Sequence, residues 1–267
     1  MKNGIGKIIS MSIAALLLVS GAVSAQNKVG DIVKSGNQYF IYLLELRTPE
    51  ANEEFQRNLS IIQAQNSQIK HLKDQIAAEK DAEKKLYLEA TMKKLEAEYR
   101  ENEKLMAQAY RFAENRTYKQ VYFKTNICVV LTKNEIAEMK MSDGTLLDPQ
   151  KMSNKSNFSM YRTTEINGSL DNDKLQNALA GLMNKQLEIN KLRKQLSETK
   201  DAVAQKSLNE KIVAAEAEIK KLDGAIRKDY KVPAGRDYAV EVSNSRLYML
   251  LTDAEVKDIL SKTRSSR

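Results

Sequence analysis

The feature that most constrains this chain is an internal repeat. Residues 55–139 align without a gap onto residues 175–259, at a constant offset of 120 positions. Lys80-Asp81-Ala82 recurs as Lys200-Asp201-Ala202, and Leu131-Thr132 recurs as Leu251-Thr252. Because the register holds over the whole stretch, the sequence indicates one duplicated structural unit, and any fold proposed for the first copy must also suit the second.

Each copy predicts two long helices. The second helix of the first copy has one apolar stripe at heptad spacing: Leu88, Met92, Leu95, Tyr99 and Met106. The stripe recurs from Leu208 to Ile226, and its phase changes around residues 80–83 and 200–203, where polar residues favour a tight turn. Thr48 before Pro49 is a good helix start, with a capping hydroxyl and a preset backbone angle. The pattern therefore predicts a coiled-coil helical hairpin, or arm, in each copy.

Segments rich in β-branched and aromatic residues flank the hairpins. In the first copy they are residues 39–44 before the hairpin and residues 119–124 and 127–131 after it. Thr125-Asn126, and Asn244-Ser245 in the second copy, supply short polar residues for a turn between two strands. We therefore expect one strand before each hairpin and two strands after it.

A short helix is predicted at the end of each copy. Thr132 with Glu135, and Thr252 with Glu255, have the spacing of a capping box, in which hydroxyl and carboxylate satisfy free amide groups. The predicted fold class is thus α+β, mainly α, with two tandem copies of strand, long antiparallel helical hairpin (coiled coil), two strands and short helix.

The predicted domains follow from these boundaries. Residues 1–25 are a signal peptide, residues 26–141 and 158–267 are the two coiled-coil units, and residues 142–157 are a linker that contains Asp143-Gly144 and Pro149. A three-stranded sheet with a two-helix arm has little core of its own and exposes strand edges. We therefore expect the units to associate with each other or with other chains.

The first 25 residues have the three parts of a secretory signal. Lys2 and Lys7 form a basic start, residues 13–19 are apolar, and Val23-Ser24-Ala25 ends in small residues. The alternative is a membrane anchor, but the uncharged stretch is only marginally long enough, and it ends in small residues without aromatic or basic residues after them. Cleavage after Ala25 would leave a soluble protein, located in the periplasm or secreted.

Charge and composition narrow the class of partner. The formal net charge of +8 becomes +6 when Lys2 and Lys7 are removed, so the mature chain stays basic. Only 6% of the residues are aromatic and none is Trp, which disfavours one large globular core. A basic protein suits acidic protein segments or an anionic membrane surface, whereas export makes nucleic acid the least suitable partner.

No residue cluster predicts catalysis, a cofactor or a metal. His71 is the only histidine and Cys128 the only cysteine, so no metal-ligand set can be assembled around them. Cys128 could be a reactive thiol, but its apolar strand favours a small buried hydrophobic residue. The chain also lacks a Gly-rich phosphate loop, a G-x-S-x-G elbow and an H-E-x-x-H motif. We therefore expect an interaction protein and no enzyme.

The order of elements resembles the Skp/OmpH family of periplasmic chaperones. Tyr118–Met139 and Tyr238–Ile259 carry the likeness, since each has an apolar strand, a short polar turn, a second apolar strand and a Thr-initiated helix. The resemblance implies trimers whose arms enclose unfolded outer-membrane proteins. This sequence departs from the single family unit by carrying two.

The expected function is that of an ATP-independent periplasmic holding chaperone for unfolded outer-membrane or envelope proteins. Mixed-charge arms with a basic excess can attract a client, while apolar patches hold it weakly. The lysines clustered about the two predicted turns are the candidate client contacts: Lys80, Lys84, Lys85, Lys200 and Lys206. The alternative function is that of a structural coiled-coil envelope protein that acts as a spacer or docking partner. Continuous apolar exposure on the arms would favour the chaperone, and sharply polar faces would favour the spacer.

Overall fold

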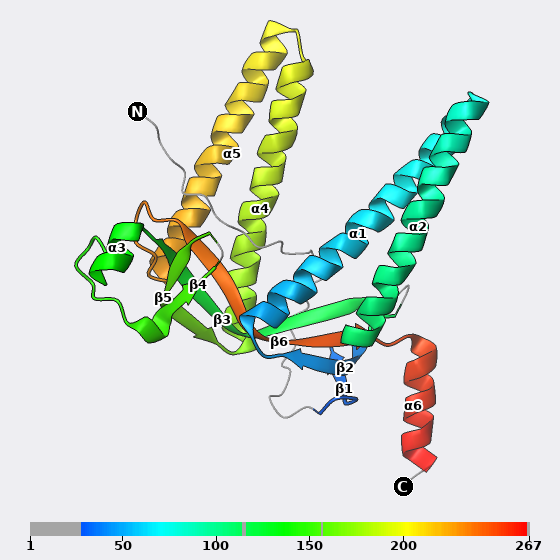
Figure 1. Cartoon of the computed structure of the whole chain (residues 1–267), viewed down its shortest axis with the longest axis horizontal. Helices are drawn as coiled ribbons and strands as arrows, with labels where there is room; N and C mark the ends of the chain where they lie inside the picture. The colour runs from blue at the N-terminus through cyan, green and yellow to red at the C-terminus, as the bar shows by residue number, and fades with distance from the viewer. Residues whose placement is uncertain (1–27, 114–115, 156, 266–267) are drawn as a thin grey trace. The chain divides into compact units, whose positions relative to one another are not determined.

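The structure, a computed structural model, describes residues 28–113, 116–155 and 157–265 (Figure 1). The predicted signal peptide, residues 1–25, lies outside the described residues. The described chain forms two compact units. Unit 1 comprises residues 122–241, and unit 2 comprises residues 28–121 together with 242–265. Neither unit coincides with one sequence repeat, because each takes elements from both copies.

The elements of the second copy follow those of the first at the 120-residue offset. The first copy contains β1 (Ile32–Ser35), β2 (Gln38–Leu46), α1 (Pro49–Ala78), α2 (Ala82–Tyr110), β3 (Tyr118–Leu131) and α3 (Lys133–Glu138). The second contains the 3-10 turn η1 (Pro149–Lys151), β4 (Met152–Asn154), β5 (Ser159–Asn167), α4 (Ser169–Glu198), α5 (Ala202–Asp229), β6 (Tyr238–Leu250) and α6 (Asp253–Ser265). The predicted linker therefore contributes a strand, β4, which is the counterpart of β1.

The strands form one antiparallel sheet in the order β1-β2-β6-β3-β5-β4. In unit 2, β2 of the first copy pairs with β6 of the second. In unit 1, β5 of the second copy pairs with β3 of the first. The predicted fold class, two tandem copies that each complete their own strands, is therefore wrong. The copies exchange strands: β2 and β5, the strands before the two helix pairs, each pair with the long strand of the other copy.

The two strands predicted after each helix pair are one continuous strand, so the turns predicted at Thr125-Asn126 and Asn244-Ser245 are also wrong. Thr125 is fully buried and lies opposite Ile166 in the ladder between β3 and β5. Ser245 is fully buried, and its hydroxyl donates to Oδ1 of Asn52 on α1, 2.5 Å away. Both side chains lie inside the protein. Ser245 is satisfied there by its hydrogen bond, whereas Thr125 Oγ1 has no partner among the described residues.

The prediction of a long coiled-coil hairpin in each copy is also wrong. The apolar stripe of the first helix pair, α1 and α2, is buried where these helices meet the sheet, in a core with strand residues of unit 2. That core comprises Leu43, Leu46, Phe55, Leu59, Ile62, Met106, Tyr110, Tyr118 and Leu247. Towards the turn between the helices, Leu88, Met92 and Leu95 are only partly buried. Burial of the stripe is thus set mainly by contact with the sheet rather than by a continuous coiled-coil seam.

The predicted helix starts are confirmed. The Thr48 hydroxyl accepts a hydrogen bond from the amide of Ala51 at 3.2 Å, and Pro49 occupies the first turn. Thr132 and Glu135 form the expected capping box at α3. Thr252 and Glu255 exchange the same two hydrogen bonds at α6, at 2.7 and 3.3 Å. Local hydrogen bonding of this kind is encoded by three or four adjacent residues.

Each capping glutamate also binds an arginine from the other copy. In unit 2, Arg116 donates to both carboxylate oxygens of Glu255, at 2.9 and 2.8 Å, and to the carbonyl of Leu250 at 2.8 Å. In unit 1, Arg236 donates to Oε2 of Glu135 at 3.0 Å and to the carbonyl of Val130 at 2.7 Å. The two ion pairs join the end of each long strand to the segment that follows the opposite helix pair.

These ion pairs predict a loss of stability in acid. Hydrogen bonds from Arg116, and then from Thr252, lower the pKa of Glu255 from 4.5 to about 2. Arg236 holds the pKa of Glu135 well below its usual range. Because both pKa values are depressed in the folded protein, the stabilisation is complete above about pH 4.5 and is lost as the pH falls through the folded pKa. Urea unfolding between pH 7 and pH 2.5 should show this decline, and Glu255→Gln should reduce it. Equal declines in both proteins would contradict the assignment.

Candidate functional site

The five predicted contact lysines lie in two groups, one at the turn of each helix pair. Lys80 is in the turn between α1 and α2, and Lys84 and Lys85 are in the first turn of α2. Lys200 is in the turn between α4 and α5, the second helix pair, and Lys206 is in the first turns of α5. All five side chains are exposed, and none forms an ion pair with a residue that the structure describes.

The surroundings of these lysines are not basic. Four carboxylate residues accompany the three lysines between Glu79 and Glu89, and three accompany the two lysines between Glu198 and Glu210. Asp81 and Asp201 are held at the helix starts, where they cap α2 and α5 through hydrogen bonds of 3.0 and 2.7 Å. The positive excess of the mature chain therefore lies outside the ends of the helix pairs.

The first helix pair has an apolar groove that was not among the predicted contact sites. The groove measures about 540 Å³, and both helices line it. Its lining comprises Glu54, Asn58, Ile61 and Ile62 of α1 and Asn102, Leu105, Met106, Gln108, Ala109 and Tyr110 of α2. Ile61 is 43% exposed and Leu105 is 60% exposed, although both neighbours, Ile62 and Met106, are buried. The groove thus presents large aliphatic side chains directly above the core of unit 2.

Two hydrogen bonds between α1 and α2 mark the ends of this apolar stretch. Asn58 donates to the hydroxyl of Tyr110 at 3.4 Å, and Asn102 donates to the side-chain oxygen of Gln65 at 3.0 Å. They hold the two helices together on either side of Ile61 and Leu105. Further along the same pair, Leu86 and Tyr87 are 68% and 73% exposed, and Tyr87 and Lys84 line a second hollow near the turn.

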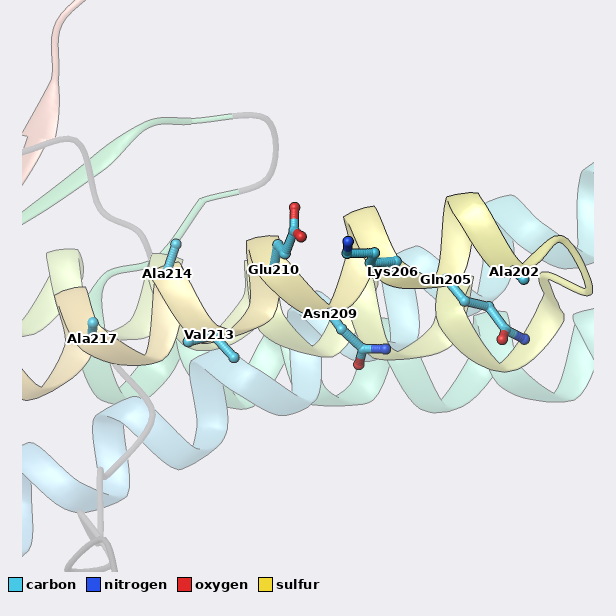
Figure 2. Close-up of a pocket in the computed structure, with 8 residues that line it drawn as sticks. All are labelled: Ala202, Gln205, Lys206, Asn209, Glu210, Val213, Ala214 and Ala217. Carbon is cyan, nitrogen blue, oxygen red and sulfur yellow. The ribbon is translucent and has the colours of Figure 1, made fainter.

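The second helix pair presents a different surface. One hollow on this pair is lined by one face of α5 alone, as Figure 2 shows. Lys206 and Glu210 project on one side of this face, and Gln205 and Asn209 project on the other (Figure 2). The rest of the lining is three alanines and Val213. This face is shallow and mixed, without the pair of large aliphatic residues that marks the first helix pair.

Residues 120 positions apart in the sequence show how the two helix pairs differ. Gly181 and Ala225 stand at the positions that correspond to Ile61 and Leu105. The ion pair of Arg193 with Glu216, at 2.8 Å, repeats that of Lys73 with Glu96, at 3.3 Å, in the first helix pair. A second ion pair between α4 and α5, Lys185 with Glu218 at 2.7 Å, differs because Gln65 stands at the position that corresponds to Lys185. The described part of the second helix pair does expose Leu187 and Val213, at 51% and 64%. Val213 lines the hollow on α5, and Leu187 is not part of that lining.

The single cysteine and the single histidine lie apart from any metal-ligand group. Among the described residues, no group of three or more His, Cys, Asp or Glu side chains could hold a metal ion. Cys128 is 2% exposed and packs with Met160 and Ala239, and burial raises the pKa of its thiol to about 12. The thiol is therefore protonated at neutral pH, as expected for a buried hydrophobic residue. His71 is exposed on α1. Across the same residues, no helix is both long and apolar enough to cross a membrane.

The sequence contains a signal for the groove that heptad spacing alone does not identify. Ile61-Ile62, Leu105-Met106 and Leu86-Tyr87-Leu88 are runs of adjacent large apolar residues. In a helix, neighbouring residues point about 100° apart, so one member of each run must leave the buried stripe. Such a run on an amphipathic helix predicts an exposed apolar side chain next to the core.

No family model, no curated protein and no solved structure matches this chain. The resemblance of Tyr118–Met139 and Tyr238–Ile259 to the Skp/OmpH family therefore remains a prediction from the order of elements, and the strand-exchanged fold departs from the arrangement on which it was based.

Proposed function

We propose that the protein is an ATP-independent holding chaperone that binds unfolded outer-membrane or envelope proteins, and that the groove of the first helix pair is its client-contact site. The observation that carries the proposal is the exposure of Ile61 and Leu105 in one groove between α1 and α2. Exposed apolar side chains grouped in a concave surface are typical of interaction sites.

The surroundings of the groove suit weak and reversible binding. Asn58, Asn102 and Gln108 border the aliphatic residues, so a client backbone would find hydrogen-bonding groups beside an apolar surface. Such a mixture holds chains of many sequences without a specific pocket. Export through the signal peptide predicted at residues 1–25 would bring the protein to the periplasm, where a chaperone must work without ATP.

The test variant combines Ile61→Gln with Leu105→Gln, because Gln is a good helix former of similar length. An unfolded outer-membrane protein is diluted from urea at low salt without nucleotide, and light scattering reports its aggregation. We expect the parent to suppress aggregation and the double variant to need on the order of 30-fold more protein. The estimate is about 1 kcal/mol lost for each aliphatic side chain that a client would partly bury.

The matched control replaces Leu187 and Val213 of the second helix pair with Gln. These residues are comparably exposed, but Leu187 does not line the hollow to which Val213 belongs, so this variant should act like the parent. A further variant with Lys80, Lys84, Lys85, Lys200 and Lys206 replaced by Gln tests the proposed electrostatic contribution separately. Equal loss in both double variants would contradict the groove as the contact site.

The second candidate function is the structural spacer, and the second helix pair favours it. Ion pairs bridge α4 and α5, and the open face of α5 is mixed and shallow. If the parent protein fails to reduce client aggregation at low salt, the chaperone proposal is wrong and the spacer becomes the better account.

A further inference from the structure

The strand pairings of the two units are reciprocal under the repeat offset. In unit 2, Phe40 lies opposite Leu250 and Leu46 lies opposite Ser245. In unit 1, their counterparts Met160 and Ile166 lie opposite Val130 and Thr125. Even the irregularity recurs, between residues 42 and 44 in one ladder and between residues 162 and 164 in the other. The pairing of β2 with β6 is therefore equivalent to the pairing of β5 with β3, with the two copies in exchanged roles.

The ion pairs show the same reciprocity. Arg116 of the first copy binds Glu255 and the carbonyl of Leu250, and Arg236 of the second binds Glu135 and the carbonyl of Val130. Each of these contacts maps onto the other when 120 is added to one residue number and subtracted from the other. Contacts in which residue i of one half meets residue j of its partner, and j meets i, define a self-complementary interface.

The buried polar groups differ between the two units. In unit 2, Gln120 donates to Oδ1 of Asn52 at 3.1 Å and to the hydroxyl of Ser245 at 2.8 Å, and Gln56 donates to Gln120. In unit 1, Val240 stands at the position that corresponds to Gln120. There, three buried oxygens have no hydrogen-bond partner among the described residues: Thr125 Oγ1, Asn172 Oδ1 and Gln176 Oε1. Gln56 Oε1, the counterpart of Gln176 Oε1, also lacks a partner among the described residues. The first copy thus supplies Asn52, Gln56 and Gln120 to the network of unit 2, whereas Val240 interrupts the corresponding set in unit 1.

From these contacts we infer that the chain is a dimer of repeats joined by a loop, and that the first repeat can pair with a second copy of itself through the same interface. Several partners that the first repeat meets in the second have a counterpart within the first repeat itself. Glu135 would receive Arg116, Thr125 would take the place of Ser245 beside Asn52, and Ile127 would take the place of Leu247 in the core. Two partners would be lost: Cys128 would replace Tyr248, whose ring lies 5.3 Å from that of Tyr42, and Asn126 would replace Arg246, which pairs with Glu45 at 3.8 Å. The self-paired form is therefore less stable than the native pairing.

The experiment cuts the folded full-length chain once. A protease site inserted between Asp143 and Gly144 lies in an exposed turn that joins the copies. After cleavage, size exclusion with light scattering should show the two fragments still together at the mass of the intact chain. Unfolding in urea, separation and refolding should then give the N-terminal fragment at twice its own mass, with the circular dichroism of folded helices. A folded monomeric fragment would overturn the inference.

A covalently linked variant keeps the test decisive if an isolated fragment fails to refold. Residues 152–267 are replaced by a second copy of residues 32–147, so that the first repeat stands in both places. This chain should unfold cooperatively, and its urea midpoint should exceed that of the converse chain, which has residues 152–267 in both places and Val240 twice. An unfolded first-repeat chain, or the opposite order of midpoints, would contradict the inference. Neither outcome depends on client binding, so the result stands apart from the proposed chaperone function.

Discussion

Replacing Arg236 with Ala is expected to lower the free energy of unfolding by about 3–5 kcal/mol, the cost of removing one partner of a buried ion pair. Arg236 is 17% exposed, and the Glu135 carboxylate that it binds is 7% exposed. The substitution leaves that carboxylate buried without its arginine, and it also removes the hydrogen bond to the carbonyl of Val130. Urea unfolding followed by circular dichroism at pH 7 measures the change.

Arg193→Ala is the matched control for this prediction. Arg193 also binds a glutamate, Glu216, at 2.8 Å, but its side chain is 57% exposed. Solvent screens an exposed pair, so the expected loss is about 1 kcal/mol or less. If the two alanine variants unfold at the same urea concentration, the link between β6 and α3 contributes no more than a surface contact, and the role assigned to Arg236 is wrong.

Phe55→Ala is expected to destabilise the protein by about 3–5 kcal/mol, the range for truncating a buried aromatic residue. Phe55 is 1% exposed in the core of unit 2, and its ring meets that of Tyr110 edge to face at 4.9 Å between centroids. The cavity would lie where α1 and α2 join the sheet. We therefore expect limited proteolysis to cut within α1 and α2 of this variant much earlier than in the parent.

The same helix supplies the control. Ile61→Ala removes an aliphatic side chain that is already 43% exposed, so the expected loss of stability is about 1 kcal/mol or less. Under the proposed function, this second variant should bind clients less well while it resists protease like the parent. A stable Phe55→Ala protein would mean that the helix pair does not depend on the core in which Phe55 lies.

The parts of the fold that follow from short stretches of sequence were predicted well. Thr48 caps α1, the boxes at Thr132 and Thr252 form, and the polar turns near residues 80 and 200 separate the helices. Caps and turns depend on a few neighbouring residues, whose hydrogen bonds form within one helical turn. The apolar spacing of α1 and α2 was also read correctly as amphipathic, although its partner was taken to be another helix rather than the sheet.

The candidate site could be predicted only in part. The lysines are exposed as expected, but their charge is balanced by adjacent carboxylates at the ends of the helix pairs. The groove around Ile61 and Leu105 depends on how α1 packs against α2. Heptad counting assigns one residue of each apolar run to the buried stripe, and it gives no exposure for the other. That exposure is a property of two packed helices, not of either one alone.

The sequence by itself determined the duplication, the helix starts at Thr48, Thr132 and Thr252, and the turns within the helix pairs, because these depend on local spacing and residue type. Only the tertiary structure decided how strands pair. An alternating strand carries no label for its partner, and β2 would satisfy its hydrogen bonds equally with β3 of its own copy or with β6 of the other. Buried side chains distant in sequence settle that choice: Ser245 bonds to Asn52, and Arg236 bonds to Glu135. Asn244 and Ser245, which suit a turn in the sequence, instead bond to Glu45 and Asn52 of the first copy and hold β6 in register with β2.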